Sequence, residues 1–295
     1  MTANVMRDPG DVSATQHRLQ VISFVAGRYV PIIFLFMLSI VIIAPMVWTV
    51  STSLRKGSDS FTVPPKWLPT DLAVENYAEV FEKVPFDRQI INSMLITWGT
   101  VFGQLVSASL AGYAFARLEF HGRDVLFWVV LATMMIPIQA VVIPVFIFLR
   151  NMGLVDTLWS LILPAVPTAF GTFLLRQYFL TIPIELEESG LIDGANQWEL
   201  FYRIYLPLVK PGLAVLAILS FNFHWNEFFR PLIFLIDNEN FPITLGIFQL
   251  QGYMMTGSIA VVLAGVVMSL VPVIIIFLLG QRYLIEGIMR GAIKG

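Results

Sequence analysis

The sequence predicts an all-α membrane protein in which six transmembrane helices form one domain. Of its 295 residues, 57% are hydrophobic and 13% are charged, whereas a soluble domain carries roughly 25% charged residues. The mean hydropathy of +0.78 points to the same class. Apolar runs of about 20 residues recur along the chain, and this is the length that a helix needs to cross a ~30 Å hydrocarbon core.

The first apolar run, at about residues 29–50, follows a polar leader, residues 1–28. A signal peptide has an apolar core of about 7–15 residues followed by a small-residue cleavage site. The run here is longer, and residues 51–56 carry no convincing cleavage site. We therefore expect a retained first span rather than a cleaved signal peptide, with residues 29–295 forming the transmembrane domain.

Five further apolar runs follow the first one. The six predicted spans cover about residues 29–50, 90–116, 125–149, 158–180, 212–236 and 259–280. Pro137 and Pro144 interrupt the third span, and Pro164 and Pro167 interrupt the fourth. Because proline removes a backbone hydrogen bond, we expect kinks at these positions, which suit a transport cavity but also occur in static bundles.

The connections between the spans predict the orientation, because cytoplasmic segments are enriched in Lys and Arg. With the N-terminus inside, eleven basic residues lie in cytoplasmic segments and six in outer segments. The outer connection at residues 237–258 has neither Lys nor Arg. Both termini are therefore predicted to be cytoplasmic, including the leader, residues 1–28, and so is the insert between the fourth and fifth spans.

That insert, residues 183–211, reads as two short helices. Pro183 sits near the start of the first helix, where its missing N–H costs nothing. Asn196 and Glu199 have the spacing of a capping box for a second helix, which we expect to run from Gln197 to about Tyr205 and to stop before Pro207. The first helix would have an exposed acidic side and an apolar side formed by Ile184, Leu186, Leu191 and Ile192. A helix lying among the lipid headgroups is the alternative, but such helices are usually rich in Lys and Arg.

Several kinds of site are excluded or disfavoured by composition. The chain has no cysteine, which excludes disulfides and thiol chemistry, and its three histidines lie far apart, so we expect no metal site. A phosphate-binding loop needs Lys followed by Ser or Thr. The five lysines instead precede Gly, Trp, Val, Pro and Gly. The chain is thus predicted not to be an enzyme, and nothing in it suggests nucleic-acid binding.

An ordered series of short patches resembles a known family over most of the chain. The patches are residues 92–94, 111–117, 133–137, 143–144, 153–157, 225–228, 231–232, 287 and 291–295. Together with the insert, they resemble the carbohydrate-type ABC-importer permeases, and within them the MalG-like branch. The family's Glu-Ala-Ala is here Glu188-Ser189-Gly190, and the internal glycine can reduce the rigidity of the first helix.

The resemblance implies that the insert is the EAA loop, which couples such a permease to a separate ATPase. The implied coupling residues are Glu187, Glu188, Ser189, Gly190, Asp193, Gly194, Ala195, Leu206 and Pro207. A tail of Gly291, Ala292, Lys294 and Gly295 would also touch the ATPase. Tyr253, Met254 and Met255, in the loop at residues 237–258, would face an extracytoplasmic solute-binding protein.

The implied machine is a sugar importer in the cytoplasmic (inner) membrane of a bacterium or archaeon. This multi-pass chain would form half of the path, beside a second homologous, MalF-like permease. Two ATPase subunits would carry the ATP and Mg²⁺, and this chain would hold no cofactor of its own. Membrane lipid would surround the spans.

Polar residues in the fifth span are the candidates for the solute path. Asn222, Asn226 and Arg230 are spaced by four and would share one helix face, with Glu227 close to Arg230. Charged residues within spans usually face a cavity or a partner. These side chains can border the path, or Glu227 and Arg230 can form a structural pair. Two weaker candidates are Gln139 and Gln104.

Three alternatives stay open at this point. The absence of a cluster of basic side chains favours a neutral, hydroxyl-rich solute, but a polyol or glycerol-phosphate remains the second candidate. An ion-driven secondary transporter would show internal repeats and titratable residues at mid-membrane, and only Glu227 and Arg230 hint at this. An intramembrane enzyme would need a His–carboxylate or Ser–His arrangement that the spans lack.

Overall fold

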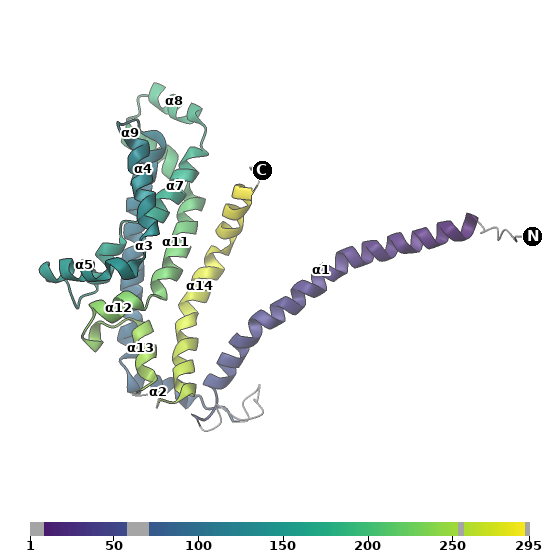
Figure 1. The fold of residues 1–295 in the computed structure, drawn as a ribbon, viewed down its shortest axis with the longest axis horizontal. Coiled ribbons are helices and arrows are strands. Elements are labelled where there is room, and N and C mark those ends of the chain that lie inside the picture. The colour runs from purple at the N-terminus through teal and green to yellow at the C-terminus, as the bar shows by residue number, and fades with distance from the viewer. Residues whose placement is uncertain (1–8, 58–70, 253–256, 293–295) are drawn as a thin grey trace, which may run out of the picture.

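The computed structural model describes residues 9–57, 71–252 and 257–292, and the regular structure in these ranges is helical. The helices are α1 (Pro9–Ser53), α2 (Glu75–Lys83), α3 (Phe86–Arg117), α4 (Arg123–Ala132), η2 (Thr133–Met135), α5 (Ile138–Asn151), α6 (Trp159–Ile162), η3 (Leu163–Ala165), α7 (Ala169–Leu180), α8 (Ile184–Ile192), α9 (Gln197–Glu199), η4 (Leu200–Tyr205), α10 (Leu206–Leu208), α11 (Lys210–Trp225), α12 (Phe229–Phe234), η5 (Asn238–Asn240), α13 (Ile243–Leu250) and α14 (Ile259–Ala292). Most of them form one elongated body, from which α1 diverges (Figure 1).

Helix α3 runs the length of the body and packs against α7 and α11. Small residues permit this close contact. A Cβ atom added to Gly112 of α3 would lie 3.0 Å from the backbone nitrogen of Arg176 in α7, and one added to Gly171 of α7 would lie 3.0 Å from Cβ of Ala108. Small residues at helix interfaces let backbones approach closely in a membrane, where packing rather than the hydrophobic effect holds helices together. Helix α3 is therefore the central helix of the body, whereas α14 packs against α11, α13, α2 and α1.

In the described part of the chain, three helices are long and apolar enough to cross a membrane, or up to six spans are present if each bent helix pair is one span. The three are Tyr29–Ser53, Phe86–Arg117 and Ile259–Tyr283, in agreement with the first, second and sixth predicted spans. The first and the last lie within longer helices, α1 and α14, that begin and end beyond the predicted boundaries.

The kink predicted at Pro137 in the third predicted span, residues 125–149, is confirmed and is sharp, whereas the one predicted at Pro144 is absent. The two parts, Arg123–Met135 and Ile138–Asn151, meet at an angle of 101°, and α5 extends sideways from the body (Figure 1). The break lies at Pro137, because the residue before a proline is pushed out of the helical region. Ile136 accordingly has an extended backbone, with φ −86° and ψ 113°. Pro144, by contrast, is accommodated inside α5.

The fourth predicted span bends more gently, by 42° between Trp159–Ala165 and Ala169–Leu180. Pro167 lies in this break, and Thr168 then starts α7 as an N-cap residue whose hydroxyl accepts a hydrogen bond from the N–H of Gly171 at 3.1 Å. The kink that prolines predicted in this span is confirmed.

The fifth predicted span, residues 212–236, was wrong as one continuous helix. Helix α11 ends at Trp225, and α12 begins at Phe229. The backbone leaves the helix after Asn226, whose φ of −94° and ψ of 4° mark the end of α11. Asn222, Asn226 and Arg230 therefore do not share one helix face.

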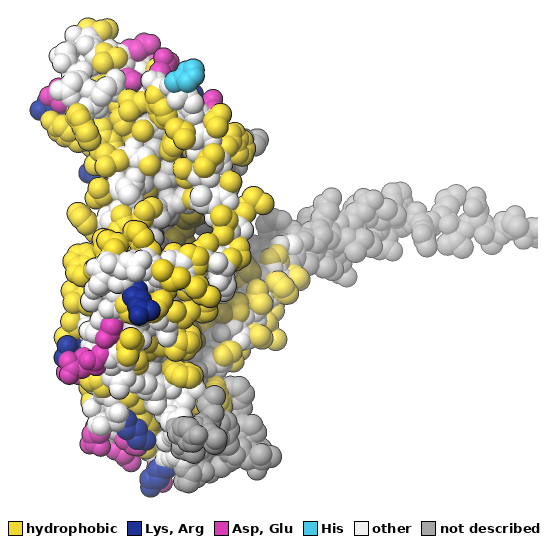
Figure 2. Space-filling model, turned by 60° about the vertical axis from the view of Figure 1, so that its left-hand side comes forward, with side chains coloured by type: hydrophobic (Ala, Val, Ile, Leu, Met, Phe, Trp, Pro, Cys, Tyr) yellow, Lys and Arg dark blue, Asp and Glu magenta, His cyan; other side chains and the backbone are white. Residues whose placement is uncertain are grey.

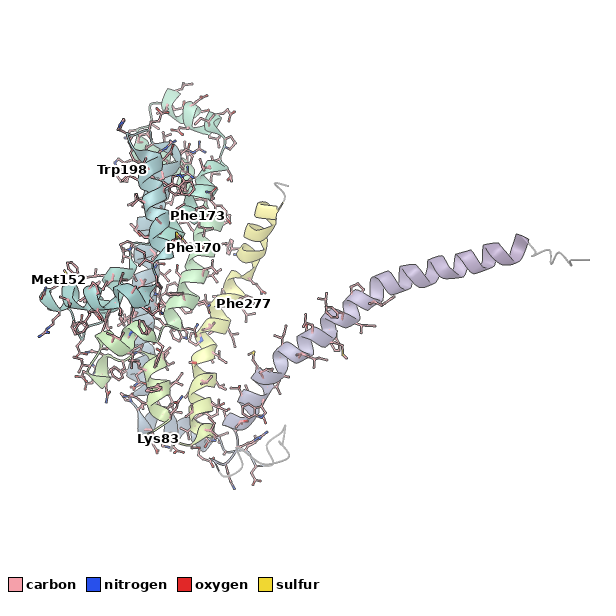
Figure 3. All side chains as sticks on the ribbon, viewed as in Figure 1. Lys83, Met152, Phe170, Phe173, Trp198 and Phe277 are labelled. Atoms are coloured by element: carbon pink, nitrogen blue, oxygen red, sulfur yellow. The ribbon has the colours of Figure 1, made fainter. Side chains whose placement is uncertain are left out.

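The body has two ends with an apolar surface between them. Trp198 lies at the end formed by α8 and α9, and Lys83 lies at the opposite end, near α2 and α13 (Figures 1 and 3). Hydrophobic side chains cover much of the surface between the ends, while Asp and Glu side chains gather near the top and over the lower part (Figure 2). This distribution fits a body whose middle lies in hydrocarbon.

Candidate functional site

The candidate docking element is the coupling segment, residues 183–208, at one end of the body (Figure 1). Its first helix, α8, begins directly after Pro183, as the sequence predicted. Glu185 and Glu187 lie in its first turn, where negative charge favourably meets the positive end of the helix dipole.

Gly194 makes the turn between the two halves of the coupling segment. Its φ of +83° is in the left-handed region, which glycine adopts without the steric cost that a Cβ atom brings. The N–H of Gly194 donates to the Leu191 carbonyl at 3.0 Å, and the N–H of Ala195 donates to the Gly190 carbonyl at 2.9 Å. This pair of bonds is a Schellman motif, which ends α8 and satisfies its last carbonyls.

Asn196 and Glu199 form the capping box that the sequence predicted. The Asn196 side chain accepts hydrogen bonds from the N–H groups of Trp198 and Glu199 at 3.0 and 3.1 Å. The Glu199 carboxylate accepts the N–H of Asn196 at 3.1 Å. The reciprocal bonds start the second half of the segment at a fixed position relative to α8.

The predicted end of the second helix before Pro207 was wrong. The helix continues as the π-helical segment η4 and the short α10 to Leu208, and only then bends by 72° into α11. A proline ring clashes with the carbonyl four residues earlier in a regular α-helix. The wider π-helical turn before Pro207 relieves this clash, so that the helix extends past the proline.

The exposed acidic side predicted for α8 is present only in part. The apolar side chains of Ile184, Leu186, Leu191 and Ile192 are exposed as well, the last of them to 86%. Glu187, expected on an exposed acidic side, is buried, while Glu185 and Glu188 are exposed. The coupling segment thus presents an apolar surface to solvent, which Trp198, 67% exposed, extends.

Arg117, the last residue of α3, explains why Glu187 is buried. Its guanidinium lies 4.0 Å from the Glu187 carboxylate and 4.9 Å from the centre of the Tyr205 ring. It also donates hydrogen bonds to the carbonyls of Phe179, at 2.6 Å, and Ile182. The Tyr205 hydroxyl donates to Glu187 as well. One arginine therefore joins α3, the end of α7 and both halves of the coupling segment.

An aromatic cluster surrounds this arginine and packs the second half of the segment against α3 and α7. Its members are Tyr113, Phe179, Phe201 and Tyr205, whose ring centroids lie 5.1 to 6.5 Å apart. The Tyr113 hydroxyl also donates to the side chain of Gln197 at 2.8 Å. Aromatic pairs at these distances add stability beyond the area they bury. The coupling segment is consequently attached to α3 at several points.

The other predicted coupling residues have local roles within the segment. Gly190 is buried against η4, and a Cβ atom there would lie 2.6 Å from a Leu200 methyl group. The Ser189 hydroxyl donates back to the Glu185 carbonyl at 2.6 Å, and Asp193 caps the end of α8. Pro207 is exposed, whereas Leu206 is partly buried beside the aromatic cluster.

Two further groups of predicted contacts lie partly or wholly outside the described residues. Gly291 and Ala292 are in the last turn of α14, but Lys294 and Gly295 lie outside the described ranges. Tyr253, Met254 and Met255 also lie outside them. The contacts of these residues remain predictions.

The predicted solute-path residues separate into two groups. Asn222 and Asn226 are exposed and bonded to each other, with the Asn226 amide donating to the Asn222 carbonyl at 2.8 Å. Gln139 of α5 is also exposed. Glu227 and Arg230 instead form an ion pair in which Arg230 donates two hydrogen bonds to Glu227. Both side chains are largely enclosed. The pairing that the sequence suggested is present, and it leaves the asparagines as the accessible polar groups.

Gln104, one of the two weaker candidates, and His224, which was not a candidate, extend this ion pair into a buried network. His224 lies 3.3 Å from the Glu227 carboxylate, so the expectation that the spans lack a His–carboxylate arrangement was wrong. The other ring nitrogen of His224 lies 3.1 Å from the Gln104 amide. Gln104 accepts a hydrogen bond from Ser220 at 2.6 Å. A lone glutamine in an apolar helix signals an interhelical contact, but its partners cannot be read from spacing. Among the described residues, no group of three or more His, Asp and Glu side chains is placed to hold a metal ion.

The chain is similar to known proteins over most of its length. The family described as binding-protein-dependent transport system inner membrane component matches residues 104–285. The probable ABC transporter permease protein YurM of Bacillus subtilis (strain 168) is 34% identical over 270 residues, which are 89% of this chain and 87% of the relative. The arabinooligosaccharides transport system permease protein AraQ of Halalkalibacterium halodurans is 36% identical over 228 residues, 77% of this chain and 81% of AraQ.

A solved structure shares the fold. A chain in the crystal structure of a bacterial ABC transporter involved in the import of the acidic polysaccharide alginate has a TM-score of 0.76 and 27% sequence identity to this one. The similarity covers 88% of this chain and 97% of that chain.

Proposed function

Because the chain belongs to the family of binding-protein-dependent transport system inner membrane components, we propose that it forms half of the path of an ATP-driven sugar importer. A second, homologous permease supplies the other half. Two separate ATPase subunits supply the energy, and an extracytoplasmic binding protein delivers the solute. The chain itself transmits motion and binds no nucleotide.

The observation that carries this proposal is the construction of the coupling segment. Its apolar surface is exposed, including Ile192 and Trp198, although a soluble face would normally carry charge. Its buried side is fixed to α3 and α7 by Arg117 and the aromatic cluster. A segment that is fixed to α3 on one side and exposes apolar side chains on the other is suited to a groove on an ATPase, because a movement of the ATPase then displaces α3 directly.

The distribution of basic residues supports an orientation in the membrane. Basic residues are more numerous in the segments at the coupling-segment side than in the outer segments, as the positive-inside rule requires of the cytoplasmic side. The coupling segment would then face the cytoplasm, with both termini on the same side. The α2 and α13 end of the body would face outward, toward the binding protein.

The solute is proposed to be a sugar with little or no charge. Arg230, the basic residue of the fifth predicted span, is neutralised by Glu227, and a phosphate group would favour an unpaired arginine or lysine. The exposed amides of Asn222 and Asn226 can exchange hydrogen bonds with hydroxyl groups. The name of the relative AraQ, a permease for arabinooligosaccharides, points to the same chemical class.

Uptake by the reconstituted complex tests both parts of the proposal. Proteoliposomes would contain this chain, the second permease and the ATPase. ATP would be enclosed in the lumen, and solute-loaded binding protein would be added outside. We expect ATP-dependent uptake of a neutral oligosaccharide that excess glycerol 3-phosphate does not reduce. Competition by glycerol 3-phosphate would contradict the assigned solute, and uptake driven by an ion gradient without ATP would contradict the importer assignment.

A further inference from the structure

The bends in the fourth and fifth predicted spans lie against the same stretch of α3. The first bend separates η3 from α7 at residues 166–168, and the second separates α11 from α12 at residues 226–228. A helix break frees backbone carbonyls that need partners inside a membrane. The identity of these partners decides whether the two bends can change independently.

Side chains of other helices satisfy the carbonyls at the first bend. Gln104 of α3 donates to the Ala165 carbonyl at 2.8 Å, and Ser107 of α3 donates to the Val166 carbonyl at 2.7 Å. Arg230 of α12 donates to the Leu161 carbonyl at 3.1 Å. The first bend is therefore held by α3 and by the element that follows the second bend.

The same glutamine also holds the second bend. Its amide oxygen accepts the Ser220 hydroxyl at 2.6 Å, and its amide nitrogen lies 3.1 Å from Nε2 of His224. His224 in turn contacts Glu227 and Arg230, on the far side of the end of α11. The network is buried, since the exposed fraction is 7% for Gln104 and 6% for Arg230. Water is thus a poor replacement for any of these partners.

We infer that Gln104 is a positioning residue that makes the two bends change together. If either bend opened alone, Gln104 would lose a partner on that side and leave a buried polar group unsatisfied. Helix α3 carries Gln104 in its middle and holds the coupling segment through Tyr113 and Arg117 at its end. A displacement of the coupling segment would reach both bends through one helix. This inference rests on the proposed function only for the source of that displacement.

Distances between spin labels test the inference, and the absence of native cysteine makes the labelling sites unambiguous. One pair, Trp159→Cys with Phe173→Cys, spans the first bend, and a second pair, Phe223→Cys with Leu232→Cys, spans the second bend. All four positions are exposed enough to be labelled. Each pair would be measured in the assembled complex, with and without bound ATP, in the parent chain and in its variants.

Three variants test the two bends separately and together. Gln104→Leu removes the shared amide and should broaden the distance distributions of both pairs at least twofold in the resting complex. Ser107→Ala removes the hydrogen bond from α3 to the Val166 carbonyl but keeps the Gln104 side chain, and it should broaden the first pair alone. Gln281→Leu changes an exposed glutamine near the end of α14 and should leave both distributions as in the parent.

In the parent, binding of ATP should shift both distances, and in Gln104→Leu at least one of these shifts should be lost. Distributions and shifts in Gln104→Leu that equal those of the parent would overturn the inference. If Gln104→Leu fails to assemble, Ser220→Ala should broaden the second pair, and an unchanged second pair would overturn the inference. The resting-state widths do not depend on transport, so a failure of the proposed function would appear separately, as parent complexes that take up no solute.

Discussion

The guanidinium of Arg117 lies 4.0 Å from the carboxylate of Glu187, although 69 positions in the sequence separate the two residues. The side chains of both are largely enclosed, with exposed fractions of 8% and 11%. Arg117 ends α3 and Glu187 lies in α8, so this contact fixes residues 183–208 to the central helix. The same arginine also caps the end of α7, which makes it the main point of attachment of the coupling segment.

Replacement of Arg117 by alanine should detach the coupling segment. Removing one partner of a buried ion pair costs about 3–5 kcal/mol, because the other charge remains buried and unpaired. We expect fast hydrogen exchange over residues 183–208 and reduced ATPase co-purification. Arg203→Ala is the matched control, since its ion pair with Glu199 is 65% exposed on the arginine side and such pairs contribute about 0–1 kcal/mol. Equal exchange in the two variants would contradict the anchoring role.

Gly194 should be sensitive to substitution because of its backbone conformation alone. An alanine there meets no neighbouring atom within 4 Å, but it must adopt a φ of +83°, which costs about 1–2 kcal/mol. Gly194→Ala should weaken binding of the ATPase subunits, measured by titration, while Gly194→Asn should have a smaller effect. Gly122→Ala carries the same strain at φ +80° outside the coupling segment. The affinity of Gly122→Ala for the ATPase subunits should equal that of the parent. An equal loss of affinity in Gly122→Ala and Gly194→Ala would contradict a specific role of Gly194 in ATPase binding.

The hydrogen bond from Tyr113 to Gln197 should contribute measurably to the attachment. A bond of this kind contributes about 0.5–1.5 kcal/mol to stability. Tyr113→Phe should therefore destabilise the chain by that amount in thermal unfolding, and Gln197→Ala should add little further destabilisation once Tyr113 is replaced. Tyr202→Phe, at a ring that is 48% exposed, serves as the control. Strictly additive effects of Tyr113→Phe and Gln197→Ala would show that the bond contributes nothing.

Asp156, outside the predicted spans, should make its contact with residues 236–240 sensitive to acid. Partial desolvation raises the pKa of its carboxyl, but hydrogen bonds from the N–H groups of Ile236 and Asp237 and from Asn240 outweigh that effect and leave the pKa below its usual value. A lowered pKa in the folded state means that the stabilisation is complete above the unfolded pKa of about 3.9. It is lost as the pH falls through the lower folded value.

The measurement is amide exchange at Ile236 and Asp237 between pH 6 and pH 3, corrected for the intrinsic rate. In the parent, protection of these two amides from exchange should fall as the pH approaches 3. In Asp156→Asn it should be independent of pH, because the amide accepts hydrogen bonds but does not titrate. Asn is also tolerated at the φ of +62° that Asp156 adopts. A parent profile as flat as that of Asp156→Asn would contradict this assignment.

The family and the local signals of the coupling segment could be predicted from the sequence. The family is confirmed by the match over residues 104–285. The start of α8 after Pro183 and the capping box of Asn196 and Glu199 depend on residues within four positions of one another. Signals that span only a few residues can be recognised in the sequence because they need no tertiary partner.

The errors concern features that depend on distant residues. From its residue type alone, Glu187 is expected to be exposed. Its burial is favourable only because Arg117, at the end of another helix, lies beside it. The end of α11 at Trp225 also lacks a local breaker, because Asn226 and Glu227 form no strong stop signal. There the contacts of His224 and Arg230 with α3 and α6 hold the break. Hydrophobic periodicity carries no information about such contacts.

The coupling segment is proposed to face the cytoplasm and to be covered there by an ATPase. Because the chain has no cysteine, a single Ile192→Cys variant, at a position that is 86% exposed, can be labelled with a membrane-impermeant maleimide. We predict labelling from the cytoplasmic side only, and at least tenfold slower labelling once the ATPase subunits are bound. Labelling from the outside, or an unchanged rate in the assembled complex, would contradict the account.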